Sequence, residues 1–232
     1  AMHTRKIVDP DWGGKVTGGS GKVSFAVLAA SDQWPALTRE NNPYPGKNAN
    51  YLVGRMKYTL SGENSVGAIV SSRDWGESIN RAAGVDFRFK RGQAHSFYGN
   101  MIHTISDDPA GEGRRSGSAL NLTWDYESRP LNMFLMAEHY DKDFNMETAF
   151  YRRTGMSDIY YYFCPMWYPD SEKFPYIRAM RTFTFGFFIH DWHTGLDDWF
   201  TQIVIHPQFA WNGWLRMDAN IWAESWGGTT YK

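Results

Sequence analysis

The sequence repeatedly alternates apolar with polar residues at a period of two, in segments separated by turn residues. In the clearest segment the apolar residues are Leu120, Leu122, Trp124 and Tyr126, and the polar residues between them are Asn121, Thr123 and Asp125. Two further segments set Val85, Phe87 and Phe89 against Asp86, Arg88 and Lys90, and Leu52, Met56, Tyr58 and Leu60 against Arg55, Lys57 and Thr59. Successive side chains on a β-strand point to opposite faces, so each segment predicts a strand with one apolar and one polar face.

Segment length and aromatic content favour a membrane-spanning barrel over a soluble sandwich. Strands of soluble sheets usually have about five or six residues, whereas strands that cross a bilayer need about 9–11. Aromatic residues make up 17% of the chain, and barrels place such residues against lipid and at its interfaces. We therefore predict an all-β, antiparallel up-and-down transmembrane β-barrel with about twelve strands in this chain. The predicted strands span residues 14–19, 22–31, 49–60, 64–74, 80–91, 93–105, 116–127, 130–140, 155–168, 175–190, 196–208 and 213–225.

The predicted connections are of two kinds. Tight turns join strands at 61–63 and 91–92, and longer polar loops span 32–48, 106–115 and 169–174. Outer-membrane barrels have short turns on the periplasmic side and longer loops on the other side. The pattern therefore predicts that the two kinds of connection lie on opposite rims.

Composition and charge exclude several classes of function. The formal net charge of −1 gives no electrostatic reason to expect nucleic acid as a partner. Cys164 is the only cysteine, so an intramolecular disulfide and a zinc ribbon are both excluded, and we interpret it as an apolar filler. The mean hydropathy of −0.52 is compatible with a barrel, because only every second strand residue meets lipid.

The two ends of the sequence suggest an internal piece of a longer protein. Residues 1–11 have no apolar core of a signal peptide, and no run of the chain reaches the ~18 apolar residues of a spanning helix. Residues 227–232 resemble a turn that begins another strand. We expect a single barrel domain over residues 1–232, which either closes by itself or lacks strands at its C-terminal end.

Several ordered motifs resemble a known family. They are the segments 11–18, 24–30, 50–55, 66–69, 80–88 and 143–145, followed by Phe150 and Arg152. Together they are similar to the barrel region of a family of bacterial outer-membrane proteins of uncharacterised function, over most of residues 11–168. The sequence departs from the family at Ala149, where the family usually has glycine.

The resemblance implies a location in the bacterial outer membrane and outer-membrane lipid as a partner. Longer members of the family look like a family-9-type carbohydrate-binding domain joined to a C-terminal barrel. That N-terminal domain is absent from this sequence. The resemblance therefore implies an oligosaccharide or another polar small molecule as ligand.

Charged residues within the alternating segments are expected to face the lumen. A charge that faces lipid at mid-bilayer costs about 2–4 kcal/mol for Arg or Lys, whereas an inward charge can be paired. The lumen-lining candidates are Arg55, Lys57, Asp86, Arg88, Asp125, Arg216 and Asp218. A second polar network in the interior is expected from Glu138, Asp141, Asp143, Glu147, Arg152 and Arg153.

Neither a metal site nor a catalytic site is predicted. The weak metal candidates are His190, Asp191, His193 and His206. These residue types bind zinc, but positions three apart on a strand point to opposite faces unless a turn intervenes. The acid pairs 107–108 and 197–198 are adjacent, which turns them apart on a strand, and no Gly-x-Ser-x-Gly nucleophile motif occurs. We therefore expect no enzyme activity and no cofactor.

Aromatic residues in the C-terminal half allow two interpretations. They are Phe183, Phe185 and Phe187 on one face, and Tyr160, Tyr161, Tyr162, Phe163, Trp167 and Tyr168. The favoured interpretation is a lipid-facing band closed by an interfacial girdle. The alternative is a platform on which sugar rings stack.

The predicted function is that of an integral outer-membrane β-barrel. It acts as a pore, a transporter or a membrane anchor for a polar, saccharide-related molecule, without catalysis. Two alternatives stay open at this point: a soluble β-sandwich carbohydrate-binding module and a β-rich glycoside hydrolase.

Overall fold

The computed structural model describes residues 7–33, 43–149, 151, 153–226 and 229–231. This part of the chain contains 13 β-strands and no helix, and therefore no helix that is long and apolar enough to cross a membrane. The strands are β1 (Pro10–Ser20), β2 (Val23–Asp32), β3 (Ala49–Ser61), β4 (Asn64–Trp75), β5 (Ser78–Arg91), β6 (His95–Asp108), β7 (Gly113–Glu127), β8 (Leu131–Tyr140), β9 (Met156–Trp167), β10 (Ile177–Asp191), β11 (Leu196–Phe209), β12 (Met217–Trp226) and β13 (Thr229–Tyr231).

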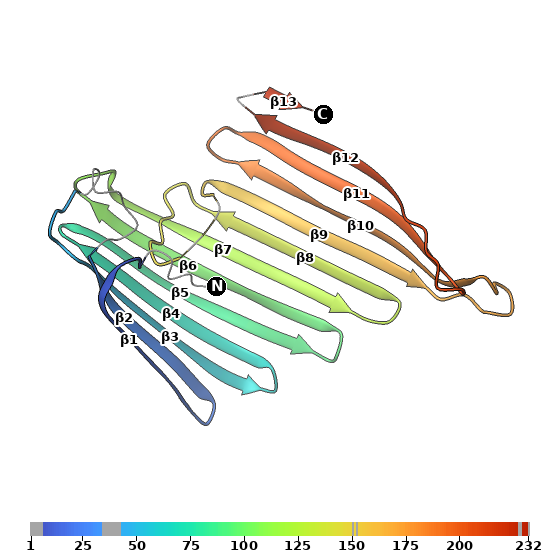
Figure 1. The fold of residues 1–232 in the computed structure, drawn as a ribbon, viewed down its shortest axis with the longest axis horizontal. Coiled ribbons are helices and arrows are strands. Elements are labelled where there is room, and N and C mark those ends of the chain that lie inside the picture. The colour runs from blue at the N-terminus through green and yellow to red at the C-terminus, as the bar shows by residue number, and fades with distance from the viewer. Residues whose placement is uncertain (1–6, 34–42, 150, 152, 227–228, 232) are drawn as a thin grey trace. The chain divides into compact units, whose positions relative to one another are not determined.

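All the strands belong to one sheet in which each strand pairs with its neighbour in sequence (Figure 1). Every pair whose register is defined is antiparallel. The all-β, up-and-down prediction is therefore confirmed. In the described part of the chain β1 and β13 are the two edges of the strand order, so the sheet is not closed, and a closed barrel stays a prediction.

The strands divide between two compact units, which we describe separately. Unit 1 comprises residues 1–88, 99–120 and 140–155, and unit 2 comprises residues 89–98, 121–139 and 156–232. Unit 1 therefore contains β1 to β4 and most of β5, whereas unit 2 contains β9 to β13.

The expected separation of short turns from long loops holds for the connections predicted in unit 1, because the tight turn at 61–63 and the connection at 33–48 lie at opposite ends of β3. It does not hold for every connection. In unit 1 the two-residue turn at 76–77 lies at the same end as the connection at 33–48, part of which (34–42) lies outside the described residues. In unit 2 the long connection at 168–176 lies at the same end as the turn at 128–130, because Met166 N near the end of β9 donates to the Pro130 carbonyl oxygen at 2.8 Å. Local sequence decides turn length: Gly76 has a φ of 59°, which is favourable for glycine at the start of a tight hairpin.

The two faces of the sheet in unit 1 have opposite chemistry. The strand register places one row of apolar residues across β2 to β5, namely Phe25, Met56, Ala68 and Val85. The next row along the strands, on the opposite face, is Ser24, Lys57, Gly67 and Asp86. Met56 is 53% exposed and Val85 is 59% exposed. We call the side of Met56 the apolar face and the side of Lys57 the polar face.

The hydrophobic core of unit 1 lies on its polar face. One buried cluster consists of Ala30, Ala49, Tyr51 and Trp75, and a second consists of Ala82, Ala119, Phe144 and Met146. The cluster residues on β2 to β5 alternate in phase with Lys57 and Asp86. The large side chains of the apolar face are thus left uncovered while packing takes place on the other side.

Candidate functional site

Residues 143–149, part of the connection between β8 and β9, fold against the polar face of unit 1. In this 143–149 segment Phe144 and Met146 are 4% and 1% exposed. Both pack into the cluster that contains Ala82 and Ala119, with Ile102 beside it. A loop is therefore anchored on the sheet by two apolar side chains.

Two polar side chains of the sheet bind the backbone of this segment. Asn80 is fully buried, and its Nδ2 donates to the Asn145 carbonyl oxygen at 2.6 Å while its Oδ1 accepts from Glu147 N at 3.1 Å. Thr104 Oγ1 accepts from Asn145 N at 3.1 Å. Buried backbone groups need such partners, because leaving one unpaired costs about 1–3 kcal/mol.

An ion pair joins the same segment to β4. Arg73 Nη1 lies 2.5 Å from Glu147 Oε2, and the exposed fractions of the two side chains are 8% and 21%. Arg73 Nη2 also donates to Ser78 Oγ at 2.8 Å. Tyr151, which packs against the same cluster, donates from its Oη to Asn145 Oδ1 at 3.0 Å, and burial raises the pKa of Tyr151. These contacts fix the position of the 143–149 segment on the sheet.

Gly117 of β7 provides the space for this backbone. A Cβ at position 117 would lie 2.4 Å from Phe144 N and 2.7 Å from Phe144 Cα. We therefore expect Gly117→Val to displace the 143–149 segment at a cost of about 1–3 kcal/mol from overpacking. Limited proteolysis should cleave the segment much faster in this variant than in the wild type.

Gly14→Val is the control for this prediction, because a Cβ at position 14 meets no atom within 4 Å. It should leave the cleavage rate unchanged. Equal protection of the segment in Gly117→Val and wild type would show that Phe144 does not lie against β7.

The structure brings together only part of the second polar network that the sequence predicted. Glu138 Oε1 accepts from Asn121 Nδ2 at 2.5 Å in unit 2, whereas Asp141 Oδ2 accepts from Ser118 N at 2.7 Å in unit 1. Asp143 is exposed and Glu147 pairs with Arg73, whereas Arg152 and Phe150 lie outside the described residues.

Sequence reasoning missed Asn80, Arg73 and Gly117 as residues of the site. A signal was available, because two of the motifs in the family resemblance, 80–88 and 143–145, are the ones that meet through Asn80 and Asn145.

The charged candidates of unit 1 share the polar face. Arg55 Nη2 lies 2.7 Å from Asp86 Oδ1 across the neighbouring strand. Lys57 lies in the same row as Asp86, and Arg88 is the register partner of Ser65 two residues further along. These four residues therefore occupy one side of the sheet, as the alternation predicted.

The candidates of unit 2 include a second ion pair. Arg216 Nε lies 3.3 Å from Asp218 Oδ1, and Gln202 Nε2 donates to Asp218 Oδ2 at 3.2 Å. Asp125 follows Thr123 by two residues on the same side of β7, and Thr123 is buried. We call the side of Asp218 the polar face of unit 2.

The three phenylalanines of β10 lie on this polar face, not on the opposite one. Phe183 is the register partner of Val204, which in turn pairs with Asp218. Phe185 and Phe187 follow at two-residue steps and face Gln202 and Phe200. These phenylalanines and Asp218 share one side of the sheet, so the two predictions, phenylalanines toward lipid and Asp218 toward the lumen, are incompatible. The phenylalanines of β10 alternate with Thr and Gly, which carry no charge, so the sequence did not show which side of this strand is the polar one.

The tyrosines of β9 divide between the two faces. Tyr160 and Tyr162 are register partners of Phe187 and Phe185, so they belong to the polar face. Tyr161 and Phe163 lie on the other face, where Phe163 is exposed. Aromatic rings thus form a continuous surface on the polar face, with centroid distances of 5.8 Å for Tyr162–Phe183 and 5.7 Å for Phe185–Phe200.

One end of unit 2 is rich in exposed aromatic residues. Trp167 packs edge-on against Phe174 at 5.2 Å, and the Arg129 guanidinium lies 5.0 Å from the Tyr168 ring. Trp211 and Trp214 are also exposed in the connection between β11 and β12. Trp167 is the last residue of β9 and Tyr168 follows it, so both lie at a strand end. The interfacial girdle stays a prediction.

The four metal candidates do not meet. His190 Nδ1 lies 2.7 Å from Asp197 Oδ1, and Asp191 accepts from the backbone of His193. His206 is the register partner of Arg181 on β10. It lies nine residues beyond Asp197 on β11, a separation of about 30 Å at the spacing of a strand. Among the described residues no group of three or more metal-binding side chains is present.

Comparison of the chain with protein-family models, with curated proteins and with solved structures finds no match. The resemblance to an outer-membrane family therefore stays a prediction. The function has to be inferred from the two faces of the sheet.

Proposed function

We propose that this chain forms the wall of a membrane-spanning β-barrel in a bacterial outer membrane, where it passes or anchors a polar, saccharide-related molecule without catalysis. The observation that carries the proposal is the pair of adjacent rows in unit 1. The row containing Met56 is apolar and exposed, and the row containing Lys57 is polar and lies on the face that carries the core packing. Lipid would cover the first row and water the second.

Strand length supports a crossing of the bilayer. The strands from β1 to β12 have between 10 and 15 residues, and a tilted transmembrane strand needs about 9–11. In unit 2 the face opposite Asp218, which we call the apolar face of unit 2, also carries exposed apolar residues, among them Ile159, Phe188 and Ile203. A soluble module of this composition would need a second layer to cover these side chains.

The polar face supports a lumen with paired charges. Arg55–Asp86 is an ion pair on the polar face of unit 1, and Arg216–Asp218 is an ion pair on the polar face of unit 2. The 143–149 segment lies on the same face of unit 1, and inward-folded loops narrow or plug the lumen of many barrels. The arrangement favours selection of polar solutes by size and charge.

The aromatic surface of unit 2 favours a sugar-related solute. Phe183, Phe185 and Phe200 lie on the side of Asp218 and Gln202, so flat rings stand next to hydrogen-bonding groups. Sugars present both an apolar ring face and hydroxyl groups. We therefore favour the interpretation of these rings as a platform on which sugar rings stack over their interpretation as a lipid-facing band.

Catalysis is not part of the proposal because the acidic residues have other partners. Asp197 pairs with His190, while Asp198 Oδ1 accepts from Ser225 N at 2.7 Å. Glu147 is held by Arg73. Hydrolysis of a glycosidic bond needs two carboxylates that face the same sugar.

Passage is tested by reconstituting the chain in liposomes and measuring the uptake of neutral oligosaccharides of increasing length. We expect uptake that falls steeply with length, since the lumen has a fixed cross-section. Phe185→Ala should alter the rate, and Phe188→Ala on the apolar face is the matched control. Absence of uptake at every length would refute the pore and leave the anchor role.

A further inference from the structure

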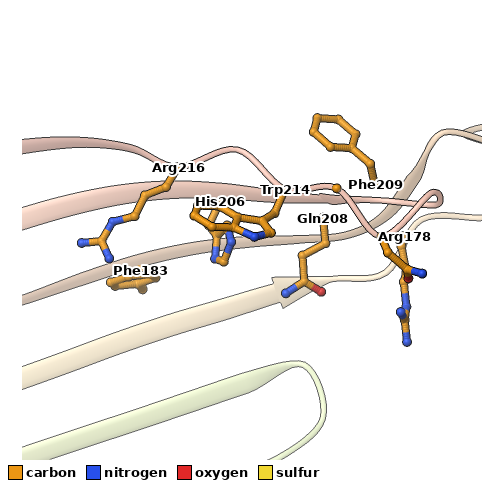
Figure 2. Close-up of a pocket in the computed structure, with 9 residues that line it drawn as sticks. Arg178, Phe183, His206, Gln208, Phe209, Trp214 and Arg216 are labelled. Carbon is orange, nitrogen blue, oxygen red and sulfur yellow. The ribbon is translucent and has the colours of Figure 1, made fainter.

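A pocket of about 390 Å³ lies on unit 2 at the end of β10 and β11. Its principal lining residues are Arg178, Phe183, His206, Gln208, Trp214 and Arg216 (Figure 2). The volume falls at the lower end of the range for small-molecule sites, which is about 300–1,000 Å³. In the view of Figure 2 the two arginines stand at opposite ends, with Trp214 and His206 between them.

The connection between β11 and β12 positions the aromatic wall. Trp214 forms an isolated β-bridge with Gln208, and its ring meets the His206 ring edge-on at 5.5 Å. Asn212 holds the turn with a φ of 65°, a conformation that Asn adopts more readily than most other residues. Trp214 is 67% exposed, so much of its ring is free to contact a ligand.

The pocket is positively charged. Arg216 is oriented by Asp218 and by Gln202 Oε1, which accepts from its Nη2 at 3.3 Å, and its guanidinium lies 5.9 Å from the centre of the Phe183 ring. Arg178 makes no ion pair with a residue that the structure describes. No acidic residue is among those that line the pocket.

We propose that this pocket binds the carboxylate-bearing ring of an acidic saccharide. Guanidinium groups bind carboxylates in paired hydrogen bonds, so Arg178 and Arg216 account for the charge. The Trp214 ring suits the apolar face of a sugar, and the Gln208 amide supplies a donor and an acceptor for hydroxyl groups. An aromatic acid would leave the Gln208 amide without a ligand partner, and a neutral sugar would leave Arg178 without an anionic one.

This inference names the chemical class of the solute in the proposed function, and it rests on that function only for the idea that the polar face meets a solute. Binding to the pocket is measured on the full chain in detergent micelles, without any passage across a membrane. Failure of binding and failure of membrane insertion are therefore separate results.

The experiment titrates the chain with digalacturonate and follows tryptophan fluorescence and calorimetric heat. We expect saturable binding that Arg178→Gln weakens about tenfold or more, the loss typical of one hydrogen bond to a charged group. Trp214→Leu should weaken binding and remove much of the fluorescence change. Arg91→Gln, at the end of β5 and outside the pocket, is the control and should bind like the wild type.

Two further probes separate the contribution of the carboxylate to binding from that of the sugar ring. A neutral galactose disaccharide and benzoate should each bind at least tenfold more weakly than digalacturonate. The proposal is overturned by equal affinity for the neutral disaccharide, by equal affinity for benzoate, or by digalacturonate binding that Arg178→Gln leaves unchanged. Absence of saturable binding in the wild type would overturn it as well.

Discussion

Met56→Arg is expected to lower the stability of the membrane-inserted protein by about 2–4 kcal/mol, the cost of an arginine that faces lipid near the middle of a bilayer. Met56 lies near the middle of β3, is 53% exposed, and stands between Phe25 and Ala68 on the apolar face. The neighbouring Arg55 points to the other face, where it pairs with Asp86. Denaturant titration of the protein in liposomes measures the loss.

Ser24→Arg is the matched control for this variant. Ser24 is also exposed, and it is the register partner of Lys57, so it lies at nearly the same height along the strands as Met56 but on the polar face. We expect Ser24→Arg to cost less than about 1 kcal/mol, since the added charge meets water. Equal losses in both variants would contradict the assignment of the two faces.

Glu147→Gln is expected to destabilise unit 1 by about 3–5 kcal/mol, because it leaves the charge of Arg73 buried without its partner. The exposed fraction of the Arg73 side chain is 8%, and Glu147 Oε2 lies 2.5 Å from it. The 143–149 segment should also lose its packing against the polar face of unit 1. Denaturant titration together with the proteolysis of that segment measures both effects.

Glu112→Gln provides the comparison, because Glu112 forms an ion pair with Arg115 in which the glutamate side chain is 71% exposed. Exposed pairs contribute about 0–1 kcal/mol, so this variant should be nearly neutral. In a double-mutant cycle, Arg73→Leu combined with Glu147→Leu should recover part of the loss of either single variant. Purely additive losses would mean that the two side chains do not interact.

Strand positions could be predicted from the sequence because side-chain alternation is a local property. β3 and β11 end within one residue of their predicted limits. The start of β12 was missed: residues 213–216 form part of a loop, in which Phe209 N donates to the Gly213 carbonyl oxygen. Alternation of apolar and polar residues gives no information about such backbone hydrogen bonds within a loop.

The assignment of residues to the polar or the apolar face was predictable where the two faces differ in charge, as at Lys57 and Asp86. It was not predictable on β10, where Phe183, Phe185 and Phe187 alternate with Thr and Gly. The register places them on the side of Asp218, which was predicted to face the lumen. The site under the 143–149 segment was missed because its contacts, such as Asn80 with Asn145, join residues 65 positions apart. Only the shared family motifs hinted at that contact.

The most direct test of the two-faced sheet is the accessibility of spin labels along β3 in liposomes. Single cysteines at positions 52, 53, 55, 56, 57 and 58, in a Cys164→Ala background, would each carry a nitroxide label. We expect collision with oxygen to be highest at 52, 56 and 58, and collision with a water-soluble nickel complex to be highest at 53, 55 and 57. Uniform access of the nickel complex to all six positions would contradict a membrane-spanning strand.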